Sequence, residues 1–317
     1  MKVSIIIVNY NGKDLLEKVI ASIHNSKFRD YEVIVLDNAS TDGSQDFIKK
    51  NYKNVNLVTN KTNLGYSGIN SALKYCKGEY ILFLNNDMEI EKDCIRNLIK
   101  VIDSDKGIAM VAPKLVNFFE RECKSGGTWV SRAFYNGHIK DDGKNITKEI
   151  PYLGVGLIKK DFVGLFGYLF DDDYFIYAED LDLGLRIRLT GKKVMFEPDA
   201  IAYHMHSVTT WKTGKHFSTF LMERNLLTTF FKIFSVKNIV LYLPYVLFGR
   251  LAAIIKDTLN FQFTTAFSRI KALFWILFNF SSISKKRMET QKFRKVNDSY
   301  IFQVFNEKYL FMPKFIV

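Results

Sequence analysis

The feature that most limits the fold of this chain is an alternation, over its first 112 residues, of short apolar runs with amphipathic stretches. The runs are rich in Val and Ile and short enough to be buried strands, and they lie at residues 3–8, 31–36, 55–58, 80–84 and 108–112. Between them, apolar residues recur at helical spacing within residues 15–23, 69–76 and 95–102. Such βαβ repeats predict an α/β fold with a mostly parallel central sheet flanked by helices.

Polar segments follow three of these expected strands, at residues 8–12, 37–43 and 85–87. Open parallel sheets bind ligands at the carboxyl ends of their strands. We therefore expect the three polar segments to converge on one edge of the sheet. The stretch "YILFLNNDMEI" is the sharpest case, because an apolar run ends there in two asparagines and an aspartate. A simple turn explains these residues, and so does a metal site.

The next hundred residues are less regular. Residues 114–150 are polar and contain glycine without a clear period, which indicates loop and irregular structure over the sheet. A helix follows in "EDLDLGLRIRLTG", where Gly191 is placed to end it. Strands are expected near 193–196 and 200–203. One domain should therefore cover residues 1–215.

The remaining segment, residues 216–317, differs in charge and composition. Residues 211–317 hold 17 Lys and Arg against 5 Asp and Glu, whereas residues 1–210 hold 28 of each. Two apolar, aromatic stretches lie at 238–255 and 272–283, but Pro244 and Arg250 interrupt the first and the second has about 12 residues, short of the roughly 20 that a membrane span needs. Helices of this kind beside basic clusters favour contact with an anionic membrane surface, and core helices of a small helical subdomain are the alternative.

Several other classes of protein fit the sequence poorly. Its three cysteines form no CxxC pair, which argues against a disulfide framework or a zinc knuckle and favours a reducing, cytosolic location. The apolar run at the start is about six residues long, too short for a signal peptide. The first loop reads "NYNG" rather than GxGxxG, which disfavours a dinucleotide oxidoreductase, and it is not the Gly-rich, basic loop of a nucleotidyltransferase. Nucleic-acid binding is disfavoured because the C-terminal aromatics lie in long apolar runs.

Six segments of the chain together resemble a known family. They read "VSIIIVNYNG", "VIVLDNASTDGS", "NLGYSGINSAL", "ILFLNNDMEI", "YFIYAEDLDLGLRIRLTG" and "AYHMHSVTT". In order and spacing they resemble an inverting family 2 glycosyltransferase of the GT-A fold, closest to the rhamnosyltransferase-like branch, whose members commonly end in a segment like "ERNLLTTFFKIF". The resemblance covers about residues 1–235. It implies transfer of a sugar from a nucleotide-diphosphate donor to a hydroxyl of a glycan or lipid-linked acceptor, in surface polysaccharide or glycoconjugate synthesis.

The resemblance also implies a donor-binding site. Tyr10 would stack on a pyrimidine base, and Asp37 would accept the hydrogen bond of the ring N–H. The alternatives are a packed aromatic residue at the sheet edge for Tyr10 and a turn leading into "NAST" for Asp37. Asn63 and Asn70 flank two glycines whose small size would allow the nucleotide to approach closely. A plain loop-to-helix turn explains that segment equally.

A divalent cation, Mg²⁺ or Mn²⁺, is implied in the same way. Asn85, Asn86 and Asp87 match the DxD position of the family, where the last aspartate binds the metal and the preceding residue lies by the ribose. His204 corresponds to a histidine that can complete the metal shell, with His206 as its competitor and a structural histidine as the alternative. Because Asn85 replaces the first carboxylate, weaker metal binding, partial metal independence or a catalytically silent, donor-binding relative are further alternatives.

The "AED" segment carries the implied catalytic base. Asp180 would remove the proton of the acceptor hydroxyl as its oxygen attacks the anomeric carbon, which gives inversion in one displacement. Glu179 would orient the acceptor, while acidic residues in a first helical turn also occur for dipole reasons alone. The donor nucleotide would be dTDP- or UDP-linked. With the basic C-terminal segment, the resemblance implies a cytoplasmic enzyme, peripheral on the inner face of the cell membrane, with an anionic membrane surface as partner and no nucleic acid.

Overall fold

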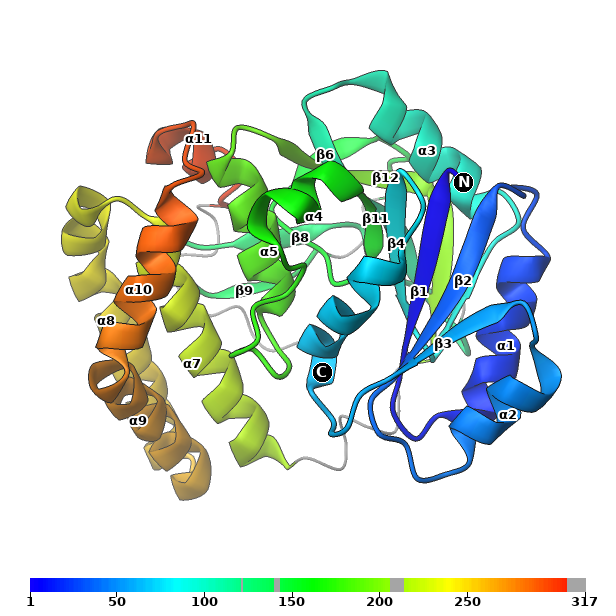
Figure 1. Cartoon of the computed structure of the whole chain (residues 1–317). Helices are drawn as coiled ribbons and strands as arrows, with labels where there is room; N and C mark the ends of the chain where they lie inside the picture. The colour runs from blue at the N-terminus through cyan, green and yellow to red at the C-terminus, as the bar shows by residue number, and fades with distance from the viewer. Residues whose placement is uncertain (121, 140–142, 206–213, 307–317) are drawn as a thin grey trace.

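The computed structural model describes residues 1–120, 122–139, 143–205 and 214–306 (Figure 1). Its centre is a ten-stranded sheet in the order β10-β12-β6-β11-β4-β1-β2-β3, with β5 also paired to β12 and β7 to β6. The five strands expected in the first part of the chain are confirmed as β1 (Val3–Asn9), β2 (Tyr31–Asp37), β3 (Val55–Thr59), β4 (Tyr80–Asn85) and β6 (Ile108–Asn117). Their buried side chains, mostly Val, Ile and Leu, contribute to the main hydrophobic core.

The register of the central strands positions the polar segments. Strand β1 lies between β2 and β4 and is parallel to both, with Asn9 opposite Asp37 and Val8 opposite Asn85. The carboxyl ends of these three strands therefore lie at one level, on the lower side of the sheet in Figure 1. The expected convergence of the loops after β1, β2 and β4 is confirmed.

The sheet is mixed rather than mostly parallel. Strand β11 (Gly156–Lys159) inserts antiparallel between β4 and β6, and β10 (Lys148–Ile150) and β5 (Met88–Ile90) pair antiparallel with β12 (Lys193–His204). The two strands expected near 193–196 and 200–203 are one strand, β12, whose pairing with β6 is irregular between Glu197 and Ile201. That irregularity explains why the sequence pattern appeared to break there.

Residues 114–150 are more regular than their sequence indicated. Strand β6 continues to Asn117, and the segment also contains β7 (Cys123–Ser125) and the hairpin of β8 (Thr128–Val130) with β9 (Asn136–His138). The expectation of loop structure was wrong for these parts. Strands of three residues are too short to show an alternating pattern, so only their partners reveal them.

The helices of the first part flank this sheet. They are α1 (Lys13–His24), α2 (Ser44–Asn51), α3 (Cys94–Ser104), α4 (Lys160–Phe166) and α5 (Glu179–Leu189). Gly191 follows the end of α5 at φ 78°, as expected for a residue that stops a helix. The apolar face at 69–76 belongs to a 3₁₀ helix, η1 (Gly65–Tyr75), rather than to an α-helix. Its buried Ile69 and Ala72 are three residues apart, a spacing that a 3₁₀ helix aligns.

The C-terminal helices form a second layer. They are α7 (Lys215–Ile233), α8 (Val236–Leu259), α9 (Phe263–Phe278), α10 (Phe280–Gln291) and α11 (Asp298–Phe302). The apolar stretch at 272–283 is divided at Asn279 between α9 and α10. In Figure 1, α7 lies between α5 and the outer pair α8 and α9, at the left. A second hydrophobic cluster joins Leu181 and Leu185 of α5 to Leu226 and Phe230 of α7. The domain boundary at residue 215 stays a prediction. The second hydrophobic cluster contains residues from both sides of this boundary.

Candidate active site

A buried asparagine at the end of β1 connects two residues of the predicted donor site. The Asn9 amide donates through Nδ2 to Oδ2 of Asp37 at 2.9 Å, and its Oδ1 accepts from Nδ2 of Asn86 at 2.8 Å. Asn9 is fully buried, so these bonds are not exchanged with water. The sequence analysis did not single out Asn9. Its signal was a polar residue inside the buried end of a strand.

Asp37 is held mainly by its own loop. Its Oδ1 accepts from the backbone N–H of Ser40 at 2.9 Å and from Nε2 of Gln45 at 2.8 Å, and the residue is 1% exposed. This is the turn that was the alternative reading of "NAST". A hydrogen bond from a nucleobase to Asp37 stays a prediction, and it would add to the donors that Oδ1 and Oδ2 already have. Tyr10 is 37% exposed, so its ring is open to stacking.

The two glycines of η1 make room for protein rather than for a nucleotide. A Cβ on Gly65 would overlap the backbone of Phe175, and one on Gly68 would overlap the side chain of Asn38. Gly65 also adopts φ 62°, which favours glycine. At both glycines, the space that a Cβ would take is therefore filled by protein. The expectation that this space admits the nucleotide is wrong. Their role is to let η1 pack against the loop before α5 and the loop after β2.

The two asparagines that flank these glycines are also occupied by protein. Asn63 accepts through Oδ1 from the N–H of Gly65 at 2.9 Å. Asn70 donates through Nδ2 to the carbonyl of Phe170 at 2.7 Å, and its Oδ1 accepts from the N–H of Leu169 at 2.9 Å. Both side chains shape loops, which is the alternative reading. Their predicted contact with the donor is not supported by these bonds.

The predicted metal ligands do meet. Strand β5 pairs with the end of β12, and Nε2 of His204 lies 3.2 Å from Oδ1 of Asp87, whose side chain is almost fully buried. A carboxylate oxygen and an imidazole nitrogen suit Mn²⁺ and, less well, Mg²⁺. Within the residues that the structure describes, no three His, Cys, Asp or Glu side chains form a metal-binding group. A cation here would take its remaining ligands from the donor diphosphate and water. His206 lies outside the described residues.

Tyr66, which the sequence analysis missed, connects the metal side of the site with the acidic helix. Burial raises the pKa of its hydroxyl well above the usual value. The negative charges of Glu179, Asp87 and Asp180 raise this pKa further. Three carboxylates from two distant parts of the chain therefore lie within electrostatic reach of one phenol. The position of Tyr66 inside a Gly-rich segment is the only signal of it in the sequence.

The acidic pair at the start of α5 is strongly perturbed. Burial raises the pKa of Asp180 to about 6, although hydrogen bonds from the backbone N–H groups of Leu181 and of Asp180 itself oppose the rise. Burial, with the neighbouring charge of Asp180, raises the pKa of Glu179 well above its usual value. Among the described residues, Oε2 of Glu179 has no hydrogen-bond partner. A carboxyl group with a free buried oxygen can accept or donate a hydrogen bond to a bound hydroxyl.

The backbone just before this pair is strained, and α7 holds it. Tyr177 and Ala178 adopt φ values of 71° and 59°, which are unfavourable for residues with a Cβ. Nδ2 of the buried Asn225 donates to the carbonyls of Ile176 at 3.1 Å and Tyr177 at 2.6 Å. These bonds from the "ERN" segment of α7 hold the turn that precedes Glu179 and Asp180.

Buried ion pairs fix the rest of α5. Nζ of the fully buried Lys232, on α7, lies 2.6 Å from Asp171 and 2.8 Å from Asp182. Arg186 pairs with Asp182 at 2.8 Å, and Lys286 of α10 pairs with Asp171. Burial alone would raise the pKa of Asp171, but the charges of Lys232 and Lys286 outweigh it and hold this pKa below its usual value. The carboxylate of Asp182 therefore takes part in ion pairs within the protein.

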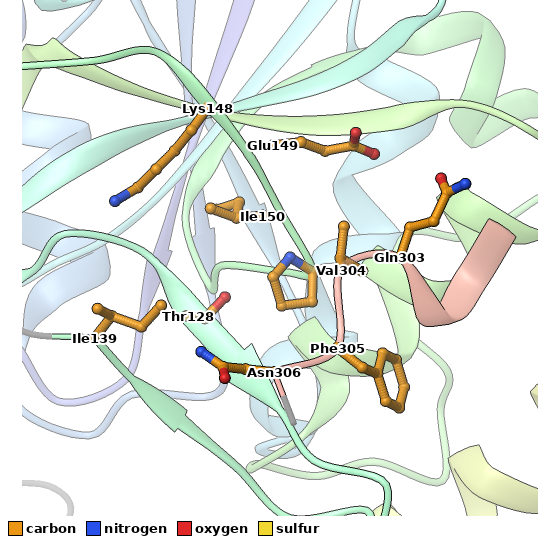
Figure 2. Close-up of a pocket in the computed structure, with 10 residues that line it drawn as sticks. Thr128, Ile139, Lys148, Glu149, Ile150, Gln303, Val304, Phe305 and Asn306 are labelled. Carbon is orange, nitrogen blue, oxygen red and sulfur yellow. The ribbon is translucent and has the colours of Figure 1, made fainter. Parts of the chain in front are cut away.

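One cavity, of about 350 Å³, lies apart from this site (Figure 2). It is bounded by β8, β10 and residues 303–306, and its ten lining residues include none of the predicted site residues. Its acidic group, Glu149, is paired with Arg188. The cavity therefore adds no group to the candidate active site.

Comparison with known proteins agrees with this geometry. The family model described as "Glycosyl transferase family 2" matches residues 4–161. Among solved structures, one of GalNAc-T7 with UDP, GalNAc and Mn²⁺ superposes with a TM-score of 0.64 at 17% identity, over 79% of this chain and 50% of that one. At that identity the likeness concerns the fold alone. The GT-A fold expected from the sequence, with its C-terminal helices, is confirmed.

Three curated relatives represent the sequence matches. A poly(ribitol-phosphate) beta-glucosyltransferase of Bacillus spizizenii is 40% identical over 102 residues, which are 30% of this chain and 16% of that protein. The UDP-Glc:alpha-D-GlcNAc-diphosphoundecaprenol beta-1,3-glucosyltransferase WfaP of Escherichia coli is 36% identical, over 33% of this chain and 42% of that protein. Rhamnosyltransferase WbbL of Escherichia coli K12 is 26% identical, over 64% and 83%. The chain thus spans well under two thirds of the first two relatives.

Proposed function

We propose that this chain, whose residues 4–161 form a family 2 glycosyltransferase domain, transfers a sugar from a nucleotide diphosphate to an acceptor hydroxyl with inversion. The observation that supports the proposal most directly is the meeting at Tyr66 of the charges of Asp87, after β4, and Asp180, at the start of α5. Single-displacement transfer needs a group that faces the leaving diphosphate and a base on the other side of the sugar.

Asp180 is the proposed base. Its carboxylate takes the proton of the acceptor hydroxyl while that oxygen forms a bond to the anomeric carbon and the bond from this carbon to the diphosphate breaks. A pKa of about 6 lets the group be ionised at neutral pH and still bind a proton well. Glu179, with its free buried oxygen, is proposed to hold the acceptor. Tyr66, whose hydroxyl is affected by the charges of both sides, is proposed to contact the substrate.

Asp87 and His204 are the proposed ligands of a divalent cation. When bound, such a cation neutralises charge on the departing nucleotide diphosphate. Asn86 is held by a hydrogen bond to Asn9 and is proposed to lie beside the ribose. Tyr10 remains the proposed stacking partner of the base. With Asn85 in place of an acidic residue, the protein contributes a single carboxylate at this position.

The donor is proposed to be dTDP-rhamnose or a UDP-linked hexose or N-acetylhexosamine. Similarity to a rhamnosyltransferase supports the first, and similarity to glucosyltransferases supports the second. The acceptor is proposed to be a lipid-linked or cell-surface glycan, because relatives named for a diphosphoundecaprenol sugar and for poly(ribitol-phosphate) act on such molecules. The enzyme would then work at the inner face of the cell membrane.

A panel of nucleotide-sugars tests this proposal. The purified chain with Mn²⁺ is screened by thermal shift, and each stabilising donor is then assayed for release of its nucleotide diphosphate. We expect one donor to stabilise the chain and to be turned over, slowly with water and faster with a glycan acceptor. Stabilisation without any release would identify a silent, donor-binding relative. No stabilisation by any nucleotide-sugar would refute the proposal.

A further inference from the structure

The outer helices α8 and α9 are inverted with respect to ordinary surface helices. A helix on the surface of a soluble protein buries its apolar residues and exposes its charged ones. In α8 the buried face instead contains Arg250 and Asp257, and in α9 it contains Arg269. Three of the six charged residues of these helices therefore point into the protein.

These inward charges are paired. Nε of Arg250 lies 3.2 Å from Glu223 of α7, Arg269 pairs with the same glutamate, and Nε of Arg269 donates to Oδ2 of Asp257 at 2.8 Å. The pairing compensates for the loss of hydration that burial imposes on each charge. The inner face is thus held by ion pairs to α7, and these pairs do not explain why the outer face is apolar.

The outward face is nevertheless almost entirely apolar. Its large exposed side chains are Val236, Val240, Leu241, Leu247, Phe248, Leu251, Ile255 and Leu259 on α8, Phe261 in the turn, and Phe263, Phe267, Phe274, Leu277 and Phe278 on α9. We call this set the α8–α9 face. In these two helices, which are described along their whole length, the exposed charged residues are Lys237, Lys256 and Lys271. An apolar surface of this extent marks an interaction site.

We infer that the α8–α9 face lies flat in the interfacial region of an anionic lipid bilayer. Charge favours lipid as the occupant, because lysines stand at both ends of α8 and within α9, where their stems can lie on the apolar surface while the ammonium groups reach lipid phosphates. The surplus of 12 basic residues in residues 211–317 adds to this attraction. An apolar face bounded by basic residues is the pattern of interfacial helices.

The contacts between α8 and the rest of the protein indicate whether this helix lies on the membrane or crosses it. Of the helices in the described part of the chain, α8 alone is long and apolar enough to span a bilayer. Near its middle, however, Arg250 donates through Nη2 to the carbonyl of Phe134 at 2.8 Å and through Nη1 to that of Ala133. These carbonyls belong to the β8–β9 hairpin, which lies outside the layer of C-terminal helices. A helix bound at its middle to this hairpin lies in the membrane plane instead of crossing it.

The orientation of the protein on the membrane bears on the proposed acceptor. This part of the inference rests on the proposed function. Nζ of Lys215, at the start of α7, donates to Oε1 of Gln262 at 2.7 Å, which places the α8–α9 turn beside the beginning of α7. In Figure 1 this turn and the carboxyl ends of β1 and β2 face the same, lower side. A lipid-linked acceptor held in the same bilayer would present its sugar toward that side.

Vesicle flotation tests the inference without any sugar donor. The chain is mixed with phosphatidylcholine vesicles or with vesicles that also contain phosphatidylglycerol. We expect strong flotation with the anionic vesicles, and at least about 10-fold weaker binding by the triple variant Phe248→Glu/Leu251→Glu/Ile255→Glu, because three large side chains lose their burial in lipid. The matched control is Leu165→Glu, a change at an exposed leucine of α4 outside this face. It should bind like the wild type.

A second variant keeps the test informative if the triple variant is unstable. Reversing Lys237, Lys256 and Lys271 to Glu keeps every apolar side chain of the α8–α9 face and should weaken binding to anionic vesicles by about 100-fold or more. Alkaline carbonate should release the bound wild-type chain. Retention in the bilayer after carbonate would overturn the in-plane orientation. Absence of flotation, or a stable dimer in solution that the triple variant converts to monomer, would overturn lipid as the occupant. None of these results depends on glycosyl transfer.

Discussion

Replacing Asp180 with Asn should have opposite effects on activity and on stability. The amide has the same shape and can still accept the N–H of Leu181, which lies 2.8 Å from Oδ1 of the carboxylate. It cannot take a proton from the acceptor. Because a positioned base contributes about 10² to 10⁴ in rate, turnover should fall by that factor while donor binding is kept.

The effect on stability follows from the pKa. Burial raises the pKa of Asp180 from 3.8 to about 6, so the folded protein holds this proton more tightly than the unfolded chain does. Stability is therefore lost as pH rises from about 3.8 through about 6, and the full cost is present above pH 6. About two pKa units correspond to about 3 kcal/mol, an upper value because the side chain is only half-buried. The neutral amide avoids this cost.

The measurement is a pair of unfolding curves for wild type and Asp180→Asn at pH 4 and pH 8. At pH 4 the two should be nearly equally stable, and at pH 8 the variant should melt up to about 4 °C higher, since 1 kcal/mol is worth about 1.5 °C in a chain of 317 residues. An equal difference at both pH values would refute the burial argument. Wild-type turnover by the variant would remove Asp180 from the mechanism, whatever its stability.

Three other substitutions test the surroundings of the site. Asn225→Ala frees the carbonyls of the strained turn before α5, so kcat should fall about 10-fold with the donor KM unchanged; a change confined to KM would contradict this positioning role. Lys232→Met leaves Asp171 and Asp182 without their shared partner and should lower the free energy of unfolding by about 3–5 kcal/mol in urea titrations, whereas a loss below about 1 kcal/mol would show that the pairs contribute little. His204→Ala should raise the Mn²⁺ concentration for half-maximal activity and leave the rate at saturating Mn²⁺ nearly unchanged; an unaltered Mn²⁺ dependence would exclude it as a ligand.

Local patterns predicted the first part of the fold because the strands there have short, mainly apolar runs. The meeting of the loops after β1, β2 and β4 followed from the rule for parallel strands. The position of β11 between β4 and β6 could not be predicted. The sequence pattern of a four-residue strand does not show whether it pairs parallel or antiparallel with its neighbours. The 3₁₀ geometry of η1 was missed for a similar reason, because three- and four-residue spacings look alike over one or two turns.

The site could be predicted only in part, because much of it depends on contacts between segments that are far apart in the sequence. Gly65 and Gly68 looked like space for a ligand, and only the fold shows that Phe175 and Asn38 fill that space. Asn225 stands 45 residues after Asp180, and nothing nearby in the chain indicates that it holds the turn before α5. The apolar stretches of α8 and α9 were visible, but which side faces outward depends on Arg250 and Arg269 turning inward.

The hydrogen bonds of Asn9 and of Asn225 support two different halves of the candidate site. One half is a rigid unit of the sheet, in which a single amide locks the ends of β1, β2 and β4 together. The other half is a short acidic turn whose shape is imposed from outside by α7. Substitutions in the helical layer can therefore reshape the acceptor side while the nucleotide side stays intact, which offers descendants of this chain a route to new acceptors with an unchanged donor.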